Sequence, residues 1–168
     1  MRMHGSGLED AFKRFGFADT FTGEIQESRC HLPKFGELGD GDTAQTGIGQ
    51  GELLVTPLRM AMLASAYANG GKMMVPYLVD EVISPQGLVI RKASPAKWRD
   101  ATTEQRAALI SGFMENVVEN GTGGAAAVSG IRVTGKTGTA DKTETRNTTK
   151  EVVVSFMCFA PADDPQYI

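Results

Sequence analysis

Two β-prone runs near the end of the chain, residues 131–139 and 151–160, constrain its fold more than any other feature. The segment that joins them is polar and rich in threonine, and it has no apolar residues at helical spacing. Parallel strands need a crossover connection of about a dozen residues or more, usually a helix. This loop is too short and too polar for one, so we predict that the two runs pair as an antiparallel hairpin.

Lys136, Thr137, Gly138 and Thr139 lie in the first run and form a candidate anion site. Side chains two residues apart on a strand point to the same face, so the hydroxyls of Thr137 and Thr139 are expected to share one solvent-open face. Lys136, one residue off, can supply positive charge from the flank or the edge. Gly135 and Gly138 leave room for a ligand backbone to come close. The pattern therefore predicts carboxylate binding.

The same residues also fit the phosphate-binding P-loop, because residues 130–137 match G-x-x-x-x-G-K-[ST]. A P-loop follows a buried strand and precedes a helix whose N–H groups converge on phosphate. Residues 121–129 are instead small and glycine-rich, and residues 138–149 are polar without a helical period. Residues 78–81 could pass for the acidic strand that helps to hold magnesium, but they come before the motif, which reverses the usual order. Nucleotide binding is therefore the less favoured interpretation, and a helix after the second glycine would support it.

Three segments have the apolar spacing of helices, and they are residues 8–15, 58–69 and 106–118. Gly16 is expected to end the first helix. Thr56 and Pro57 supply an N-cap and a first residue for the second, which is apolar on almost all sides and therefore predicted to be buried. Thr102 and Gln105 form a capping box before the third helix, which is expected to run to Gly121.

The remaining segments are predicted to be turns, loops and short strands. Residues 18–51 are rich in Gly, Asp and Thr and are expected to be irregular. Residues 78–83 and 88–91 flank a turn and predict a hairpin. Residues 161–165 are expected to form a turn, and residues 166–168 the start of another strand. Helices and hairpins in this order predict an α+β fold.

Composition sets modest bounds on the class of protein. A chain of 168 residues with 41% hydrophobic content suits one domain or a large piece of one, and its net charge of −3 argues against a nucleic-acid partner. No apolar run reaches the roughly 18 residues of a membrane span, and no signal peptide is recognisable after Met1. Cys30 and Cys158 make neither a disulfide framework nor a metal site, and Cys158 is expected to be an inert buried thiol.

The order of several motifs resembles the transpeptidase domain of class B penicillin-binding proteins, the serine acyltransferases that cross-link peptidoglycan and are inhibited by β-lactams. These motifs are Gly47-Ile48-Gly49-Gln50-Gly51, Val55-Thr56-Pro57-Leu58, Tyr67-Ala68-Asn69-Gly70-Gly71, Gly121-Thr122-Gly123, Gly135-Lys136-Thr137-Gly138-Thr139-Ala140 and Phe159-Ala160-Pro161-Ala162-Asp163-Asp164-Pro165. The resemblance covers nearly the whole chain. It implies an antiparallel sheet with flanking helices, as an incomplete piece of the penicillin-binding transpeptidase or serine β-lactamase-like fold.

The family pattern has three catalytic motifs in chain order, Ser-x-x-Lys, Ser-x-Asn and Lys-Thr-Gly, and only the third has a clear match here. By resemblance, residues 1–168 are a partial domain that lacks the first two motifs and the last strand and helix, and that is inactive alone. Ser94 and Lys97 form a literal Ser-x-x-Lys, but they follow the predicted hairpin, so Ser94 is better explained as a turn or cap. Tyr67 and Asn69 mimic the Tyr-x-Asn of some related β-lactamases at what we interpret as a helix end.

The resemblance also implies roles for the third motif. Thr137 and Thr139, with Gly138 between them, would bind the terminal carboxylate of a donor stem peptide. Lys136 would be catalytic, since its charge would assist proton movement near the serine, and the N–H of Thr139 would form half of an oxyanion hole.

Peptidoglycan stem peptides and β-lactams would be the ligands, with no cofactor and no metal. The parent protein would be anchored at the extracytoplasmic face of a bacterial membrane, together with cell-wall synthesis partners. A second interpretation stays open, in which a homologue without the serine binds peptidoglycan or a partner protein through the same groove.

Overall fold

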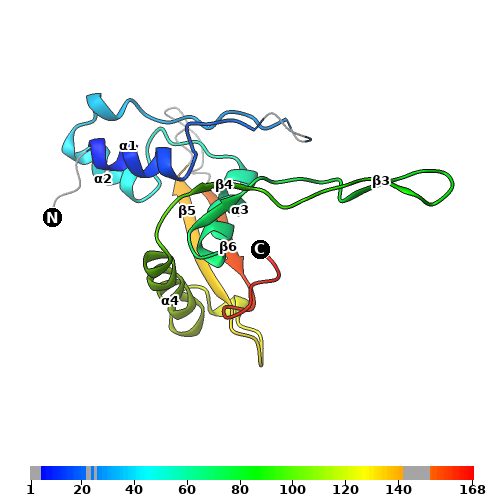
Figure 1. Cartoon of the computed structure of the whole chain (residues 1–168). Helices are drawn as coiled ribbons and strands as arrows, with labels where there is room; N and C mark the ends of the chain where they lie inside the picture. Colours follow the sequence, from blue (N-terminus) through cyan, green and yellow to red (C-terminus); the bar gives the residue numbers. More distant parts are fainter. Residues whose placement is uncertain (1–4, 22–23, 25, 142–151) are drawn as a thin grey trace.

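The computed structural model describes residues 5–21, 24, 26–141 and 152–168, and it has an α+β architecture (Figure 1). The helices are α1 (Gly5–Arg14), α2 (Asp40–Gly47), α3 (Pro57–Ala68) and α4 (Glu104–Asn120), with one-turn 3-10 helices η1 (Phe35–Glu37) and η2 (Gly124–Ala126). The strands are β1 (Lys72–Met74), β2 (Glu81–Ile83), β3 (Val89–Lys92), β4 (Lys97–Asp100), β5 (Thr134–Asp141) and β6 (Val152–Phe159). They form three antiparallel pairs, β1 with β4, β2 with β3, and β5 with β6.

The β5–β6 hairpin stands at the centre of the molecule and confirms the predicted antiparallel pairing (Figure 1). Its register runs from Thr134 opposite Phe159 to Asp141 opposite Val152. The first strand begins at Thr134 rather than at residue 131, because Ile131 bridges back to Val128 around Gly130. A strand and not a helix follows Lys136, and a 3-10 helix rather than a strand precedes Gly130, so the P-loop interpretation is wrong.

The three predicted helices are confirmed as α1, α3 and α4, but the cap of α4 is displaced by one residue. The Thr56 hydroxyl accepts the Arg59 N–H at 3.1 Å and caps α3, as predicted. At α4 the cap is Thr103, which accepts from the Arg106 N–H at 3.4 Å, so the capping box proposed at Thr102 is wrong. The Thr102 N–H instead donates to the Gly71 carbonyl at 3.3 Å, because these two residues continue the antiparallel pairing of β1 and β4 beyond Lys72 and Asp100.

Two regions contain regular structure that the sequence did not predict. Part of the supposedly irregular segment 18–51 is helical, since η1 and α2 lie within it; Asp40 and Asp42 in the first turn of α2 favour that helix electrostatically. Strands β1 and β4 are also additions, and β4 begins at Lys97. Ser94 is exposed in the extended segment before β4, so it is neither a turn nor a cap, and the Lys97 ammonium pairs with Asp100 at 2.7 Å.

The predicted β-hairpin at residues 78–91 is confirmed, whereas the C-terminal segment differs in detail from the prediction. Strands β2 and β3 confirm the hairpin and extend away from the rest of the molecule as a thin arm (Figure 1). Residues 161–164 form bends, within the segment 161–165 that was predicted to be a turn. The further strand at 166–168 is reduced to a single bridge between Tyr167 and Ala160. Cys30 is buried and Cys158 half-buried, so the buried thiol expected at residue 158 is wrong in degree.

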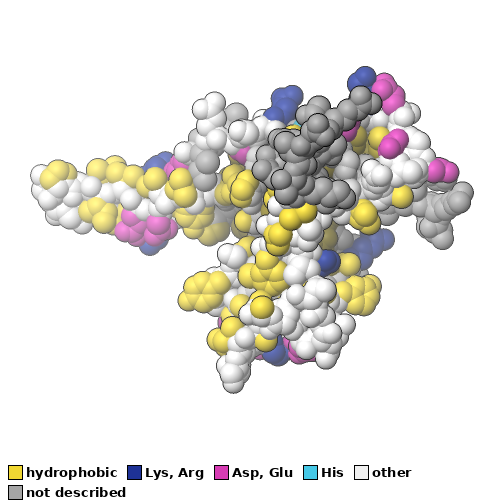
Figure 2. All heavy atoms as spheres, turned by 180° about the vertical axis from the view of Figure 1, so that it is seen from behind, with side chains coloured by type: hydrophobic (Ala, Val, Ile, Leu, Met, Phe, Trp, Pro, Cys, Tyr) yellow, Lys and Arg dark blue, Asp and Glu magenta, His cyan; other side chains and the backbone are white. Residues whose placement is uncertain are grey.

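One core cluster packs against α3. It consists of Met62, Ala66, Met73 and Ala101, with Phe15, Phe21, Leu58 and Trp98 packed around it. Further apolar side chains are buried elsewhere, among them Met114 and Val118 of α4 and Phe159 of β6. Much apolar surface stays exposed, including Leu109 and Phe113 of α4, which are 58% and 60% exposed although they belong to the apolar stripe of the predicted helix. Figure 2 shows such side chains on the projecting arm and over the lower part of the molecule. Many large apolar side chains of the described residues therefore remain exposed to solvent.

A buried ion pair fixes the N-terminal end of α3. The Arg59 guanidinium is fully buried and bonds the Glu27 carboxylate at 2.6 Å, and Glu27 also accepts the Thr56 hydroxyl proton at 2.6 Å. The guanidinium lies 5.4 Å from the ring centre of Phe21 and 5.1 Å from that of Trp98, in cation–π geometry. The pair therefore ties the segment before η1 to both α3 and β4.

Candidate functional site

Strand β5 presents a free edge, because the only strand that pairs with it in the described part of the chain is β6. The Thr137 carbonyl accepts the Lys136 ammonium at 2.6 Å, and the Thr139 carbonyl accepts the Gln50 side-chain amide at 2.9 Å. In an antiparallel pair, alternate residues turn both their N–H and C=O toward the partner strand, and the residues between them turn both away. The Thr139 carbonyl bonds Gln50 from outside the hairpin, and the Thr137 carbonyl, two residues away, bonds the side chain of Lys136 rather than β6, so the N–H groups of both threonines also face the free edge.

The side chains of the predicted site lie as the sequence required. Thr137 is half-buried and Thr139 is exposed, so neither hydroxyl is packed in the core, and their positions two residues apart place them on one face of β5. Lys136 is exposed and runs along the strand edge. The Thr137 hydroxyl lies 2.8 Å from the hydroxyl of Thr122, which belongs to the loop between α4 and η2. Thr122 had no role in the sequence analysis, although its Gly-Thr-Gly setting was noted.

Packing against the neighbouring strand accounts for the two glycines, Gly135 and Gly138. A Cβ added at Gly138 would collide with the Ser155 hydroxyl, and one added at Gly135 would collide with the ring of Phe156. Both obstacles belong to β6, which packs across these positions. The prediction that these glycines make room for a ligand backbone is therefore not needed to explain them. At both positions, side chains of β6 leave no space for a Cβ.

Gln50 reaches β5 because of the tight turn that follows α2. The N–H groups of Ile48 and Gln50 both bond the Gln45 carbonyl, at 3.1 and 2.9 Å, and the Gly49 N–H bonds the Thr46 carbonyl at 3.0 Å. Gly49 and Gly51 have φ angles of 81° and 82°, which other residues adopt only with strain. The turn therefore fixes the backbone of Gln50 and aims its side chain at the edge of β5, a contact that spans 89 residues of sequence.

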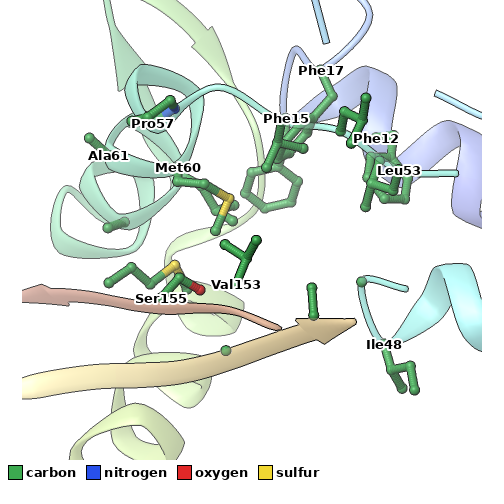
Figure 3. A pocket seen from close by; sticks show the side chains of 18 of the residues that line it. Phe12, Phe15, Phe17, Ile48, Leu53, Pro57, Met60, Ala61, Val153 and Ser155 are labelled. Carbon is green, nitrogen blue, oxygen red and sulfur yellow. The ribbon is translucent and has the colours of Figure 1, made fainter. Parts of the chain in front are cut away.

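An apolar cavity of about 960 Å³ opens beside the hairpin, between α1, α3 and β6, and its lining includes Gly138 and Thr139 of β5 (Figure 3). Phe12, Phe15, Met60 and Val153 line it, and Ser155 projects into it from β6. Among the described residues that line it, Cys158 is the only one with an ionisable side chain, and none is a His, Asp, Glu or Lys that could act as general base for a hydroxyl nucleophile. The cavity also explains why α3 is apolar on both sides, since Met62 faces the core and Met60 the cavity.

A charge pair fixes the start of β5 to α4. Arg132 donates from Nε and Nη2 to the two carboxylate oxygens of Glu115, at 2.5 and 2.8 Å. This bidentate bond lowers the pKa of Glu115 below its ordinary value and raises that of Arg132. The Glu115 side chain is only 15% exposed. The pair therefore holds in register the strand that carries Lys136, Thr137 and Thr139.

The family model described as the penicillin binding protein transpeptidase domain matches residues 2–168. The chain belongs to this family. Among curated relatives, "Stage V sporulation protein D" of Bacillus subtilis is 37% identical over 168 residues, which cover 96% of this chain and 26% of that protein. The chain therefore spans about a quarter of the length of a curated relative that it matches. Membership confirms the resemblance seen in the sequence.

Solved structures of the transpeptidase family share the fold. The D,D-transpeptidase domain of a peptidoglycan glycosyltransferase from Eggerthella lenta superposes with a TM-score of 0.86 at 32% identity, over 97% of this chain and 41% of the solved one. A ceftriaxone acyl-enzyme complex of penicillin-binding protein A from Mycobacterium tuberculosis gives a TM-score of 0.85 at 28% identity, over 95% of this chain and 35% of the other. These likenesses confirm the predicted fold class, an incomplete α+β transpeptidase fold.

Among the residues that the structure describes, no helix is both long and apolar enough to cross a membrane. Within the same residues, no three His, Cys, Asp or Glu side chains come together as a metal site would require.

Proposed function

We propose that this chain supplies the Lys-Thr-Gly-Thr carboxylate-binding strand of a peptidoglycan D,D-transpeptidase that works through an acyl-serine and binds penicillin. The observation that carries the proposal is the free edge of β5. Along it lie the cation of Lys136 and the outward N–H of Thr139, while Thr137 and Thr139 share a face beside the edge. Family membership supports the same activity.

The hydrogen-bond pattern suits binding of a carboxylate. A hydroxyl has one proton to donate. If Thr122 donates to the Thr137 oxygen across 2.8 Å, the Thr137 proton is left for a ligand, and Thr139 offers a second hydroxyl on the same face. The Lys136 ammonium adds positive potential at the edge, where its bond to the Thr137 carbonyl holds it. Charge-assisted hydrogen bonds of this kind are the strong ones.

Acyl transfer would proceed in two steps at this edge. A serine hydroxyl, contributed by a Ser-x-x-Lys motif outside this chain, attacks the carbonyl of the penultimate D-alanine. The terminal D-alanine leaves as the amine, and the donor is held as an ester. The amine of a second stem peptide then attacks the ester and frees the serine. The outward N–H of Thr139 is suited to stabilise the oxyanion that forms in both steps.

We further propose that residues 1–168 are a partial domain of a protein anchored at the extracytoplasmic face of the bacterial membrane, where it works with other cell-wall synthesis proteins. The share of the solved Eggerthella lenta chain that is covered, 41%, supports a partial domain. The Ser-x-x-Lys, the Ser-x-Asn and the last strand and helix would come from elsewhere in that protein. Among the described residues, neither Ser94 nor Ser155 has a suitable base beside it: Lys97 is paired with Asp100, and the described lining of the cavity next to Ser155 has no ionisable side chain other than the Cys158 thiol.

Labelling with a fluorescent penicillin tests this function. The complete protein that carries this chain should be labelled on one serine, and residues 1–168 alone should not be labelled. Labelling of the isolated chain at Ser94 would overturn the assignment of the nucleophile. A complete protein that binds peptidoglycan but is never acylated would support the non-catalytic homologue instead.

A further inference from the structure

Both outward carbonyls of the site are already occupied by side chains of the protein itself. The Lys136 ammonium bonds the Thr137 carbonyl at 2.6 Å, and the Gln50 amide bonds the Thr139 carbonyl at 2.9 Å. An extended peptide binds to the edge of a sheet by exchanging main-chain hydrogen bonds with it. A donor peptide that binds along β5 therefore finds the carbonyl acceptors of Thr137 and Thr139 already hydrogen-bonded to side chains of the protein.

The two contacts differ in what could replace them. Lys136 belongs to β5 and bonds the carbonyl of its own neighbour, so it moves with the strand. Gln50 comes from the glycine turn after α2, and its backbone is held there by bonds to Gln45 and by the φ angles of Gly49 and Gly51. Its side chain is half-buried and can rotate away without disturbing the turn. The Gln50 side chain can thus leave the Thr139 carbonyl while the backbone of the turn stays in place.

We propose that Gln50 is a positioning residue that caps the Thr139 carbonyl, and that an acyl donor with an N–H beside its reacting carbonyl displaces this amide when it binds. The inference rests on the proposed transpeptidase function. A neutral amide suits the task, because it satisfies a strand-edge carbonyl without drawing the donor carboxylate away from Thr137 and Thr139. Only a donor with such an N–H competes with the Gln50 amide for the Thr139 carbonyl.

The competition has a measurable size. A hydrogen bond between neutral groups contributes about 1 kcal/mol net, which is about fivefold in a rate or binding constant. Gln50→Met keeps the length of the side chain and removes the donor. In the complete protein, the second-order rate of acylation by penicillin G, whose acylamino side chain carries an N–H, should rise about fivefold. The rate with imipenem, whose side chain carries a hydroxyl in place of that amide, should stay within about twofold.

A matched control comes from Gln86, which is exposed in the turn at the tip of the β2–β3 arm. Gln86→Met makes the same chemical change away from the edge of β5, and it should alter neither rate. Gln50→Ala provides a second variant, and it should give the same selective rise, because it also removes the amide. Thermal unfolding of each variant establishes that the proteins compared are folded.

The outcomes separate this inference from the function beneath it. If the unaltered complete protein is not acylated by either compound, the transpeptidase proposal fails and the cap with it. If that protein is acylated but Gln50→Met and Gln50→Ala react with penicillin G no faster than it does, the function stands and the cap is wrong. An equal rise for penicillin G and imipenem would also overturn the cap, since a general change in the site needs no displaced amide.

Discussion

The buried pair of Glu27 and Arg59 makes a sharp prediction about stability. Glu27→Gln keeps the shape of the side chain but removes the charge that faces a guanidinium with no exposed surface. Two nitrogens of that guanidinium, Nε and Nη1, already lack a hydrogen-bond partner among the described residues. Breaking a buried pair by removing one partner costs about 3–5 kcal/mol, because the other charge stays buried and uncompensated. Cation–π contacts with Phe21 and Trp98 offset part of this, so we expect about 3 kcal/mol.

Urea unfolding of the complete protein, followed by a probe of this domain, measures the cost. The matched control is Glu37→Gln, which breaks the pair of Lys34 and Glu37 at 3.3 Å, where both side chains are more than two-thirds exposed. An exposed pair contributes about 0–1 kcal/mol, so this control should change stability by less than about 1 kcal/mol. The double variant Glu27→Met with Arg59→Met should lose less than either single one, since no unpaired charge remains. Equal losses for Glu27→Gln and Glu37→Gln would refute the reasoning.

Three further predictions concern the site and its support. In the complete protein, Thr139→Val should lower kcat/KM for acylation about 10- to 150-fold, the equivalent of 1.5–3 kcal/mol for a hydrogen bond to a charged group, and Lys136→Met should cost at least as much; parent-like rates in both would make this strand a scaffold. The lowered pKa of Glu115 stabilises the folded state only while the carboxylate is ionised, so this stability is present above the unfolded pKa and lost as pH falls through the folded one. The stability gap between the parent and Glu115→Gln should therefore be full above the ordinary Glu pKa of about 4.3 and shrink as the pH falls below it in unfolding curves, and a constant gap would contradict it. Arg132→Met should remove the same pH dependence.

Local sequence predicted those parts of the fold that depend on neighbours in the chain. Thr56 and Pro57 cap α3 with groups that lie within one helical turn, and Lys136, Thr137 and Thr139 share a strand, so their relative placement follows from its two-residue period. The cap of α4 shows where this ends. Thr102 and Thr103 are adjacent and identical, and only the distant Gly71 carbonyl, which takes the Thr102 N–H, decides which of them caps the helix.

Most of the features that the sequence did not predict depend on distant contacts. Gln50 and Thr139 are 89 residues apart, and nothing in either neighbourhood announces their hydrogen bond. Strands β1 and β4 have only three and four residues, so no alternating pattern is long enough to reveal them before they pair. The short helix α2 is hidden because Gly41 and Gly47 lower its helix propensity. Its acidic first turn was the one available signal.

The collision between a Cβ at Gly138 and the hydroxyl of Ser155 bears on how the motif changes over evolutionary time. The next nearest atoms to such a Cβ, Cβ and the carbonyl oxygen of Ser155, lie at 3.8 and 3.9 Å, which is ordinary contact. An alanine at position 138 would therefore fit in a protein whose residue 155 has no hydroxyl. In a protein that keeps this hydroxyl, the two side chains would clash unless one of them moved. The residue that fits at the third position of Lys-Thr-Gly therefore depends on packing against residue 155 of the next strand, whatever the motif binds.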